Sequence, residues 1–194
     1  MPNGPESLIC EDCRSVLNWS SDSKAVLVVA GDRDRPVLVS LATREKRLLT
    51  EHPKYPLHDY VLSRDQRWLA FRVIESLNSQ PVYISPVHSD RPSTESEWTL
   101  VLTNAPHFRP FWSTDGNILY FYAVKDNFAC LYAQHLDPVT KKRAGEAIAV
   151  KHFHGDLRPV PSVFLGYGYT GAAIYVPLSS GRADVWIAEP ERGR

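Results

Sequence analysis

Short apolar runs alternate with clusters of turn-forming residues along the whole chain. Ala25–Ala30, Trp68–Ile74 and Ile118–Ala123 are the clearest runs, and Gly31–Asp34 is the clearest turn cluster. Short apolar runs bounded by Gly, Asp and Pro are typical of β-strands. No window shows the convincing period of about 3.6 residues that marks an amphipathic helix. The pattern therefore predicts an all-β protein built from short strands.

One turn motif precedes an apolar run several times. Trp112–Gly116 has the sequence Trp-Ser-Thr-Asp-Gly, and Trp19–Ser23, Leu62–Gln66 and, more weakly, Tyr167–Gly171 occupy similar places. Asp can accept a bond from the backbone two residues on and Gly tolerates positive φ, so the motif predicts a tight hairpin. The copies begin at residues 19, 62, 112 and 167, with gaps of 43, 50 and 55 residues. Repeats at this period are typical of propeller blades.

We therefore predict a β-propeller or partial propeller of about four blades, each a four-stranded antiparallel sheet. The chain, 1–194, is predicted to form a single domain with blades at about 16–50, 59–103, 109–153 and 162–189. The last repeat offers only three strands. Either residues 6–10 supply its missing outer strand, or the chain is part of a larger ring, or two copies assemble into one. An unclosed end would expose strand edges, which native proteins avoid.

Charge and hydropathy narrow the class of protein further. The 22 basic residues balance the 22 acidic ones, so no net field attracts the chain to nucleic acid or to an anionic membrane. No apolar run approaches the roughly 20 residues that span a bilayer, and the first residues lack the pattern of a signal peptide. We expect a cytoplasmic location for the chain as given, and a periplasmic one is open if it is a fragment of a longer chain.

The cysteines allow several kinds of chemistry. Three cysteines, Cys10, Cys13 and Cys130, cannot form a full set of disulfides, so they do not suggest a secreted, disulfide-rich scaffold. Cys10 and Cys13 have the spacing of half a zinc knuckle or of a redox dithiol. A structural zinc site needs four ligands, and the missing ones would have to be histidines or Cys130. A redox pair would favour a helix N-terminus, and none is evident. We favour a structural or incidental role for the pair and predict no cofactor.

Two histidines form a second candidate metal site. His152 and His154 lie two residues apart, so in a strand they would share a face and could ligate one ion. We expect them to be solvated loop or edge residues, and we predict no metal site.

The repeated carboxylates and aromatic residues are expected to be structural. Asp22, Asp65 and Asp115 occupy the same turn position in separate blades, where each would accept bonds from its own hairpin. Aromatic residues at equivalent strand positions usually fill the space between blades. This expectation covers Trp19, Trp68, Trp112, Tyr120 and Trp186.

Polar residues recur just before the predicted inner strands. In a propeller these segments open onto the central channel, where loops commonly carry binding function. The hypothesis is a binding surface at the channel mouth, against the alternative that these are ordinary solvated loop residues. Its residues are His58, Asp59, His107, Arg109, Asp156 and Arg158.

The repeats also resemble those of a known family. The WD40-like Trp-Ser-x-Asp-Gly turns resemble TolB-like β-propellers, including bacterial proteins in which such a propeller follows a serine/threonine protein kinase domain. The resemblance rests on Ile9–Cys13, His52–Tyr55, Trp112–Asn117, Cys130–Pro138 and His152–His154. It implies a binding or scaffolding propeller. No kinase motif and no Gly-x-Ser-x-Gly elbow is present, so neither kinase nor peptidase activity carries over.

We therefore expect a propeller module that binds a protein or peptide partner and catalyses no reaction. We expect no nucleic-acid partner and no membrane insertion, and a homodimer could complete a larger ring. One alternative is a small hydrolase or metal-dependent lyase that uses His107, Arg109, His152 and His154 at the channel mouth. Another is the C-terminal sensory portion of a larger kinase-type protein.

Overall fold

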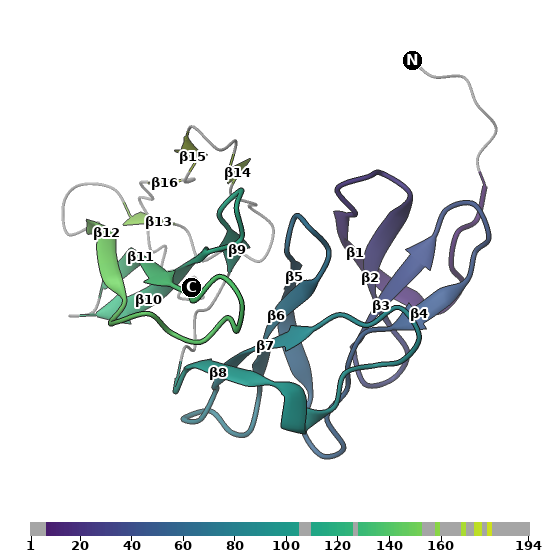
Figure 1. The fold of residues 1–194 in the computed structure, drawn as a ribbon, viewed down its shortest axis with the longest axis horizontal. Coiled ribbons are helices and arrows are strands. Elements are labelled where there is room, and N and C mark those ends of the chain that lie inside the picture. Colours follow the sequence, from purple (N-terminus) through teal and green to yellow (C-terminus); the bar gives the residue numbers. More distant parts are fainter. Residues whose placement is uncertain are drawn as a thin grey trace, which may run out of the picture.

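The computed structural model describes most of the chain up to residue 152 and short segments beyond it. The described residues are 7–104, 110–125, 128–152, 158–159, 168–169, 173–175 and 178–179. Three four-stranded antiparallel sheets make up most of this part, and in each of them the strands lie side by side in chain order. Figure 1 shows the three sheets following one another across the molecule.

The strands have the following bounds. The first blade contains β1 (Cys13–Trp19), β2 (Ala25–Ala30), β3 (Arg35–Ser40) and β4 (Lys46–Leu48). The second contains β5 (Leu57–Leu62), β6 (Trp68–Val73), β7 (Val82–Pro86) and β8 (Thr99–Leu102), with the 3-10 turn η1 (Glu95–Glu97) before β8. The third contains β9 (Phe111–Trp112), β10 (Ile118–Lys125), β11 (Phe128–His135) and β12 (Ile148–His152). Two short pairs follow: β13 (Arg158–Pro159) with β16 (Leu178–Ser179), and β14 (Gly168–Tyr169) with β15 (Ile174–Tyr175).

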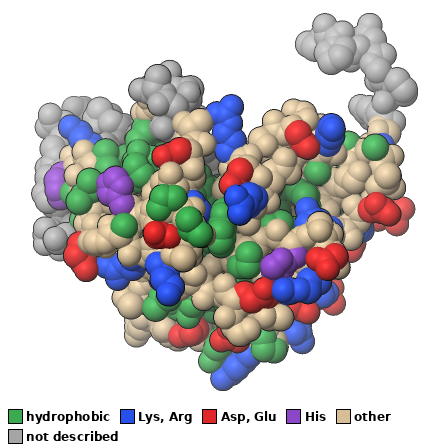
Figure 2. Space-filling view, in the orientation of Figure 1, with side chains coloured by type: hydrophobic (Ala, Val, Ile, Leu, Met, Phe, Trp, Pro, Cys, Tyr) green, Lys and Arg blue, Asp and Glu red, His purple; other side chains and the backbone are tan. Residues whose placement is uncertain are grey.

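The prediction of an all-β chain with four-stranded antiparallel blades is confirmed. The sheets span 13–48, 57–102 and 111–152, beside predicted blades at 16–50, 59–103 and 109–153. The predicted fourth blade, 162–189, lies mostly outside the described residues. Among the described residues, no helix is long and apolar enough to span a membrane. Acidic and basic side chains are interspersed over the face in Figure 2, in keeping with the balanced charge.

The blades pack face to face because alternate residues of each strand point to opposite sides. Leu27 of β2 belongs to the core between the first and second blades, whereas its neighbours Val26 and Val28 point away from the second blade. The first strands β1, β5 and β9 are neighbours in space, so they form the inner edge of the fan. The first interblade core contains Leu27, Leu38, Leu49, Leu57, Tyr60, Leu62, Leu69, Phe71 and Val73. The second contains Ala70, Val82, Ile84, Val101, Trp112, Leu119, Phe121 and Leu136.

The hairpin between the first two strands of each blade has the same hydrogen bonds in all three blades. In the third blade the Ser113 hydroxyl donates to Asp115 Oδ1 at 2.5 Å, and its oxygen accepts the backbone N–H of Ile118 at 2.9 Å. Asp115 Oδ1 also accepts the backbone N–H of Asn117 at 3.1 Å. The corresponding serine–aspartate distances are 2.6 Å in the other two blades. The prediction that these aspartates bond their own turns is confirmed.

These turns also require a left-handed residue after the aspartate. Gly116 has φ +69°, and Ser23 and Gln66 have φ +58° and +60° at the equivalent position. A side chain with a Cβ is strained there, whereas glycine is not. The loss of the turn glycine in two copies therefore leaves the geometry unchanged at a cost in backbone strain.

The turn bonds lower the pKa values of all three aspartates. For Asp22 and Asp115 the largest cause is the hydrogen bond from the serine hydroxyl, which stabilises the carboxylate form. For Asp65 the largest single cause is burial, which raises the pKa, but the bonds from Ser63 and from the Arg67 backbone lower it overall. The carboxylates are therefore stabilised in the charged state by their own hairpins.

The prediction that the aromatic residues pack between blades is wrong for one of them. Trp112 is 6% exposed, and Trp68 and Tyr120 are partly buried against the cores. Trp19, however, is 57% exposed, because no blade lies against its side of the first sheet in the described structure. Trp186 lies outside the described residues.

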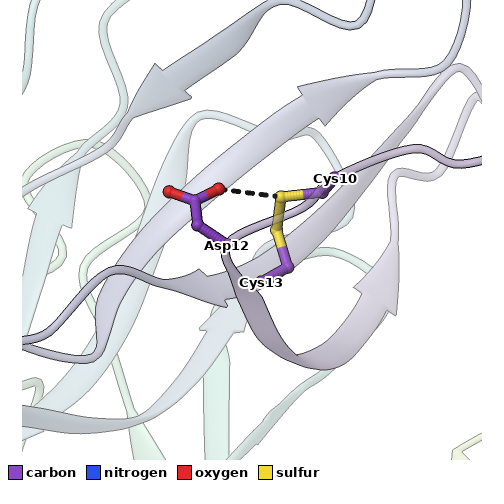
Figure 3. Close-up of side chains that lie close together, drawn as sticks. All are labelled: Cys10, Asp12 and Cys13. Atoms are coloured by element: carbon purple, nitrogen blue, oxygen red, sulfur yellow. Dashed lines mark hydrogen bonds between the residues drawn. A yellow bond between two sulfur atoms is a disulfide. The ribbon is translucent and has the colours of Figure 1, made fainter.

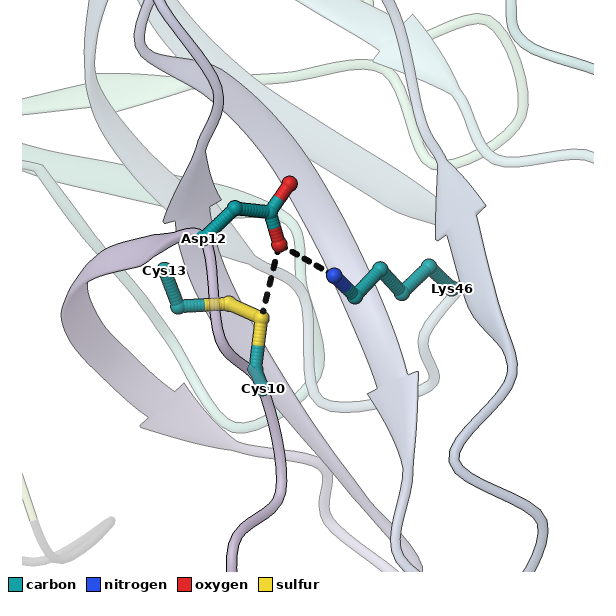
Figure 4. The surroundings of a disulfide bond; sticks show 4 residues. All are labelled: Cys10, Asp12, Cys13 and Lys46. Carbon is teal, nitrogen blue, oxygen red and sulfur yellow. Dashed lines mark hydrogen bonds and ion pairs between the residues drawn. A yellow bond between two sulfur atoms is a disulfide. The ribbon is translucent and has the colours of Figure 1, made fainter.

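Residues 7–12, which we call the N-terminal strap, run across the face of the first blade that points away from the second. Ile9 packs on a cluster formed by Val26, Val28, Ala30, Val37 and Val39. Ser7 accepts a hydrogen bond from Arg44 at 3.0 Å. A disulfide joins Cys10 to Cys13, and Asp12 pairs with Lys46, which reaches across from β4 (Figures 3 and 4). Ser7–Cys10 form no strand, and their pairing with a last-blade strand stays a prediction.

Candidate functional site

The polar residues of most interest lie at one end of the fan, which we call the channel mouth. The inner strands β1 and β5 begin there, and because neighbouring strands alternate in direction, the β2–β3 turn and the β6–β7 loop lie at the same end. We define the channel-mouth cluster by its side chains. It contains Arg14, Asp34, His58, Asp59, Tyr60, Arg72 and Gln80.

Asp59 and Arg72 form the centre of this cluster. Arg72 Nη2 lies 2.6 Å from Asp59 Oδ2, and the two side chains are only 13% and 23% exposed. Asp59 has φ +56° and lies in an irregular stretch of β5, where the pairing with β6 shifts register between His58 and Val61. Positive φ in a non-glycine residue is strained and is common where a side chain must be aimed at a site. The bulge directs the Asp59 carboxylate onto Arg72.

Arg72 also connects this ion pair to the neighbouring loop. Its Nη1 donates to Gln80 Oε1 at 2.6 Å, and the Gln80 side chain donates to Leu77 O at 3.2 Å. The Gln80 backbone N–H donates to Asn104 Oδ1 at 3.1 Å, beside the start of the connection to the third blade. The guanidinium is thus held from two sides, and its position is fixed before any ligand arrives.

Tyr60 joins the first and second blades at the same end. Its hydroxyl lies 2.6 Å from Leu57 O and also within hydrogen-bond reach of Asp34 O, so the hydroxyl proton is shared between two carbonyl acceptors. Burial, together with the nearby Asp34 and Asp59 carboxylates, raises the pKa of Tyr60 far above its usual range. The hydroxyl therefore stays protonated as a donor. Arg14 on β1 completes this side with an ion pair to Asp34 at 3.0 Å.

The structure describes only part of the predicted binding set. His58 is exposed and Asp59 is paired with Arg72, so both lie at the channel mouth. Arg158 lies in β13, where its backbone pairs with Ser179. His107, Arg109 and Asp156 lie outside the described residues.

Sequence reasoning missed the residues that hold Asp59. Arg72 is the only charged residue in the apolar run Trp68–Ile74, and this signal could have identified it. Gln80 lies in a polar loop and has no comparable signal.

The cysteine pair is a disulfide in this structure. Cys10, Asp12 and Cys13 place ligand atoms within 4.8 Å of one another (Figure 3), the arrangement of an incomplete metal site. Disulfide sulfurs are not thiolates, so this form cannot supply the two sulfur ligands that zinc prefers. A structural role for the pair agrees with its place in the N-terminal strap.

The remaining candidate ligands lie on the third blade. Cys130 Sγ is 3.3 Å from His152 Nδ1, and the two residues are cross-strand partners on β11 and β12. His152 is exposed, but Cys130 is fully buried, so a substrate on the surface could not reach the thiol. His154 lies outside the described residues.

Comparisons with solved structures identify the fold, whereas comparisons of the sequence find no match. No family model matches the chain, and no curated protein matches its sequence. Among solved structures, the putative TolB from Agrobacterium tumefaciens is similar with a TM-score of 0.53 and 20% identity, over 73% of this chain and 47% of that one. TolB from Acinetobacter baumannii is similar with a TM-score of 0.52 and 14% identity, over 69% of this chain and 31% of that one.

A third similar structure is an enzyme. The puromycin-hydrolyzing peptidase from Mycobacterium tuberculosis has a TM-score of 0.50 and 15% identity, over 66% of this chain and 22% of that one. The sheets and these similarities define the chain as a β-propeller protein. Its blades have the TolB-like propeller fold, as the sequence repeats predicted. The chain spans less than half the length of each of these structures.

Proposed function

We propose that this chain is a non-catalytic propeller module that binds a protein or peptide partner at the channel mouth. The observation that carries the proposal is the Asp59–Arg72 pair, held in place by the strained bulge of β5 and by Gln80. Polar groups that are fixed before binding lose little conformational entropy when a ligand arrives. Such a preorganised cluster at the loop end of a rigid scaffold is suited to recognition.

The exposed members of the cluster would make the direct contacts. His58 is exposed beside Asp59, and the Arg14 side chain is 58% exposed at the start of β1. Both can donate hydrogen bonds to the carbonyls or carboxylates of an extended peptide. His107 and Arg109, from the connection to the third blade, are the further contacts that the sequence predicts.

An enzymatic role is the competing class. The similar structures include a peptidase as well as TolB proteins, so the fold is compatible with either role. A hydrolase or lyase needs a reachable nucleophile or metal, and among the described residues the only cysteine–histidine pair has a buried thiol. This argues against that pair as a catalytic nucleophile. If the chain is the sensory portion of a larger protein, the alternative given above, we propose that it binds its partner at the same channel mouth.

The proposal is tested by selecting peptides from a display library on the immobilised chain and measuring their affinity by calorimetry. We expect His58→Ala, Arg14→Ala and the double variant His107→Ala/Arg109→Ala each to weaken binding, with unchanged circular dichroism. Arg64→Ala is the matched control, because Arg64 is exposed in the turn at the opposite end of the blade. Equal affinity of all variants would refute the site. Cleavage of the peptides, followed by mass spectrometry, would refute the non-catalytic role.

A further inference from the structure

The two cysteines at the N-terminal strap form a disulfide here, and we propose that the reduced form of the same segment binds one Zn²⁺ ion. Its three protein ligands are Cys10, Asp12 and Cys13. The Cys-x-x-Cys spacing lets two thiolates chelate one tetrahedral ion, and zinc also accepts a carboxylate oxygen. Thiolates favour zinc over Mg²⁺ and Ca²⁺, which prefer oxygen ligands. None of the three residues belongs to the channel-mouth cluster, so metal binding does not depend on the function proposed above.

The three donor groups already lie close together. One ligand atom from each residue lies within 4.8 Å of the others, and Figure 3 shows the Asp12 carboxylate beside Cys10. Asp12 Oδ1 is 3.4 Å from Cys10 Sγ. An oxygen and a sulfur bound to one tetrahedral zinc, at about 2.1 and 2.3 Å, lie about 3.6 Å apart. After reduction only the two sulfurs need to separate, to about 3.8 Å, which rotation about the Cα–Cβ bonds allows.

The backbone around the three ligands is held by contacts other than the disulfide. Ile9, directly before Cys10, packs on the apolar cluster that the strap covers, and Cys13 packs on the same cluster. Asp12 O accepts the backbone N–H of Gly31 at 3.3 Å, and Cys13 is the first residue of β1. Groups that are fixed before binding lose little conformational entropy when a ligand arrives. Reduction therefore leaves the ligands near one another.

Lys46 completes the charge balance of the site. Its ammonium reaches from β4 and pairs with the Asp12 carboxylate (Figure 4). Two thiolates and one carboxylate carry three negative charges, of which Zn²⁺ neutralises two and Lys46 the third. A carboxylate has two oxygens, so Asp12 can bind the ion through one and accept the Lys46 hydrogen bond through the other. The pairing seen in the disulfide form is thus compatible with the metal-bound form.

The disulfide and the zinc site are alternative states of one short loop. A dithiol reductant supplies two electrons and two protons, converts the Cys10–Cys13 bond into two thiols and leaves as a disulfide itself. Zn²⁺ then displaces the two thiol protons, which pass to solvent as two Zn–S bonds form. Both cysteines are partly exposed, so the reductant and the ion can reach the sulfurs. Water takes the fourth position of the tetrahedron.

Native mass spectrometry of the full chain with Zn²⁺, before and after reduction, tests the proposal. The reductant is a phosphine, which is oxidised to the phosphine oxide and offers no thiolate to the metal. We expect one Zn²⁺ per reduced chain and none on the disulfide form. Calorimetry should give a Kd at least about 100-fold higher for Cys13→Ser, because removing only a group bonded to a metal ligand already costs about 10–100-fold.

A matched pair of variants tests the carboxylate. Asp12→Asn should raise the Kd at least about 10-fold, because it removes the charged ligand. Glu11→Gln removes an exposed carboxylate from the same loop and should leave the Kd unchanged. Equal effects of the two changes would overturn the three-ligand site, since any nearby negative charge would then be sufficient.

Alkylation of the reduced protein, followed by mass spectrometry of its peptides, locates the ion. Zn²⁺ should protect Cys10 and Cys13 from alkylation. Protection confined to Cys130, or zinc binding that persists unchanged in Cys13→Ser, would place the ion elsewhere and overturn the proposal. A reduced chain that binds no zinc would overturn it as well.

Discussion

The left-handed turn position offers a prediction with opposite signs in two blades. Ser23 and Gly116 occupy equivalent places, with φ +58° and +69°. We expect Ser23→Gly to stabilise the protein and Gly116→Ser to destabilise it. A Cβ on Gly116 would meet only Lys141 Nζ, at 3.9 Å, which is an ordinary contact. Backbone conformation should therefore dominate both effects.

The magnitude follows from two opposing terms. Left-handed backbone costs a residue with a Cβ about 1–2 kcal/mol. Glycine gives the unfolded chain more freedom, which costs about 0.4–1 kcal/mol on folding. The difference is a gain of about 0.5–1 kcal/mol for Ser23→Gly and a loss of similar size for Gly116→Ser. For a chain of this length, each kcal/mol changes the melting temperature by about 2–4 °C.

Urea unfolding and thermal melts followed by circular dichroism provide the measurement. Arg64→Gly is the matched control, since Arg64 lies in the turn of the second blade at a position with ordinary φ, and it should destabilise. The double variant Ser23→Gly/Gly116→Ser should return close to the original stability, because the two sites lie in different blades. If Ser23→Gly destabilises as much as Arg64→Gly does, backbone strain does not govern these turns.

The remaining predictions concern the turn carboxylates, a buried lysine and the N-terminal strap. Because the pKa of Asp115 is lowered in the folded protein, its carboxylate stabilises the fold above the ordinary pKa of 3.8, and this stabilisation is lost as pH falls through the lower folded pKa. Thermal melts between pH 7 and 2 should therefore show a smaller acid-induced loss of stability in Asp115→Asn than in the unsubstituted protein. An equal loss of stability in both proteins would contradict this. Lys141 is 3% exposed, and its Nζ donates to Gly116 O and Asn117 Oδ1 at 2.8 and 3.1 Å. Lys141→Met should therefore lower the free energy of unfolding in urea by about 1–3 kcal/mol. An unchanged free energy would refute the idea that Lys141 stabilises this turn. Reduction of the Cys10–Cys13 disulfide, or Cys13→Ser, should lower the free energy of unfolding by about 2 kcal/mol, because the short loop is no longer closed, and should speed hydrogen exchange in the strap. Cys130→Ala is the control for the loss of a thiol. Unchanged exchange would show that the contacts of Ile9 and Asp12 are sufficient to hold the strap.

The blade architecture was predictable because its determinants are local. The serine, the aspartate and the following apolar run lie within a few residues of one another, and the structure shows each turn closed by bonds inside that segment. The alternation within β2 likewise assigns Leu27 and Val28 to opposite faces without any knowledge of their neighbours. The same turn motif and the same alternation occur in each blade, so the sequence contains several independent signals for the blade structure.

The channel-mouth cluster was only half predictable because its determinants are not local. Asp59 stood out by its position before a predicted inner strand, but its carboxylate is directed onto Arg72 by a register shift of β5 against β6. The sequence of β5 marks that bulge only weakly, because aspartate adopts positive φ more often than most residues but far less readily than glycine. The disulfide was missed for another reason: an odd number of cysteines argued against pairing, although Cys10 and Cys13 are close enough to pair without Cys130.

Trp19 is exposed although the residues at the equivalent position in the other two blades are buried. A propeller blade has two faces, and sequence repetition gives every blade the residues for both, whether or not a neighbour is present. Trp112 and Leu62 contact the preceding blade and are buried, while Trp19 has the same place in the repeat and no preceding blade among the described residues. The repeat therefore fixes the residue type at this position, whereas its burial depends on what lies against the blade. Among the described residues, Ile9 of the N-terminal strap covers the part of this face formed by β2 and β3, and Trp19 on β1 stays 57% exposed beside it.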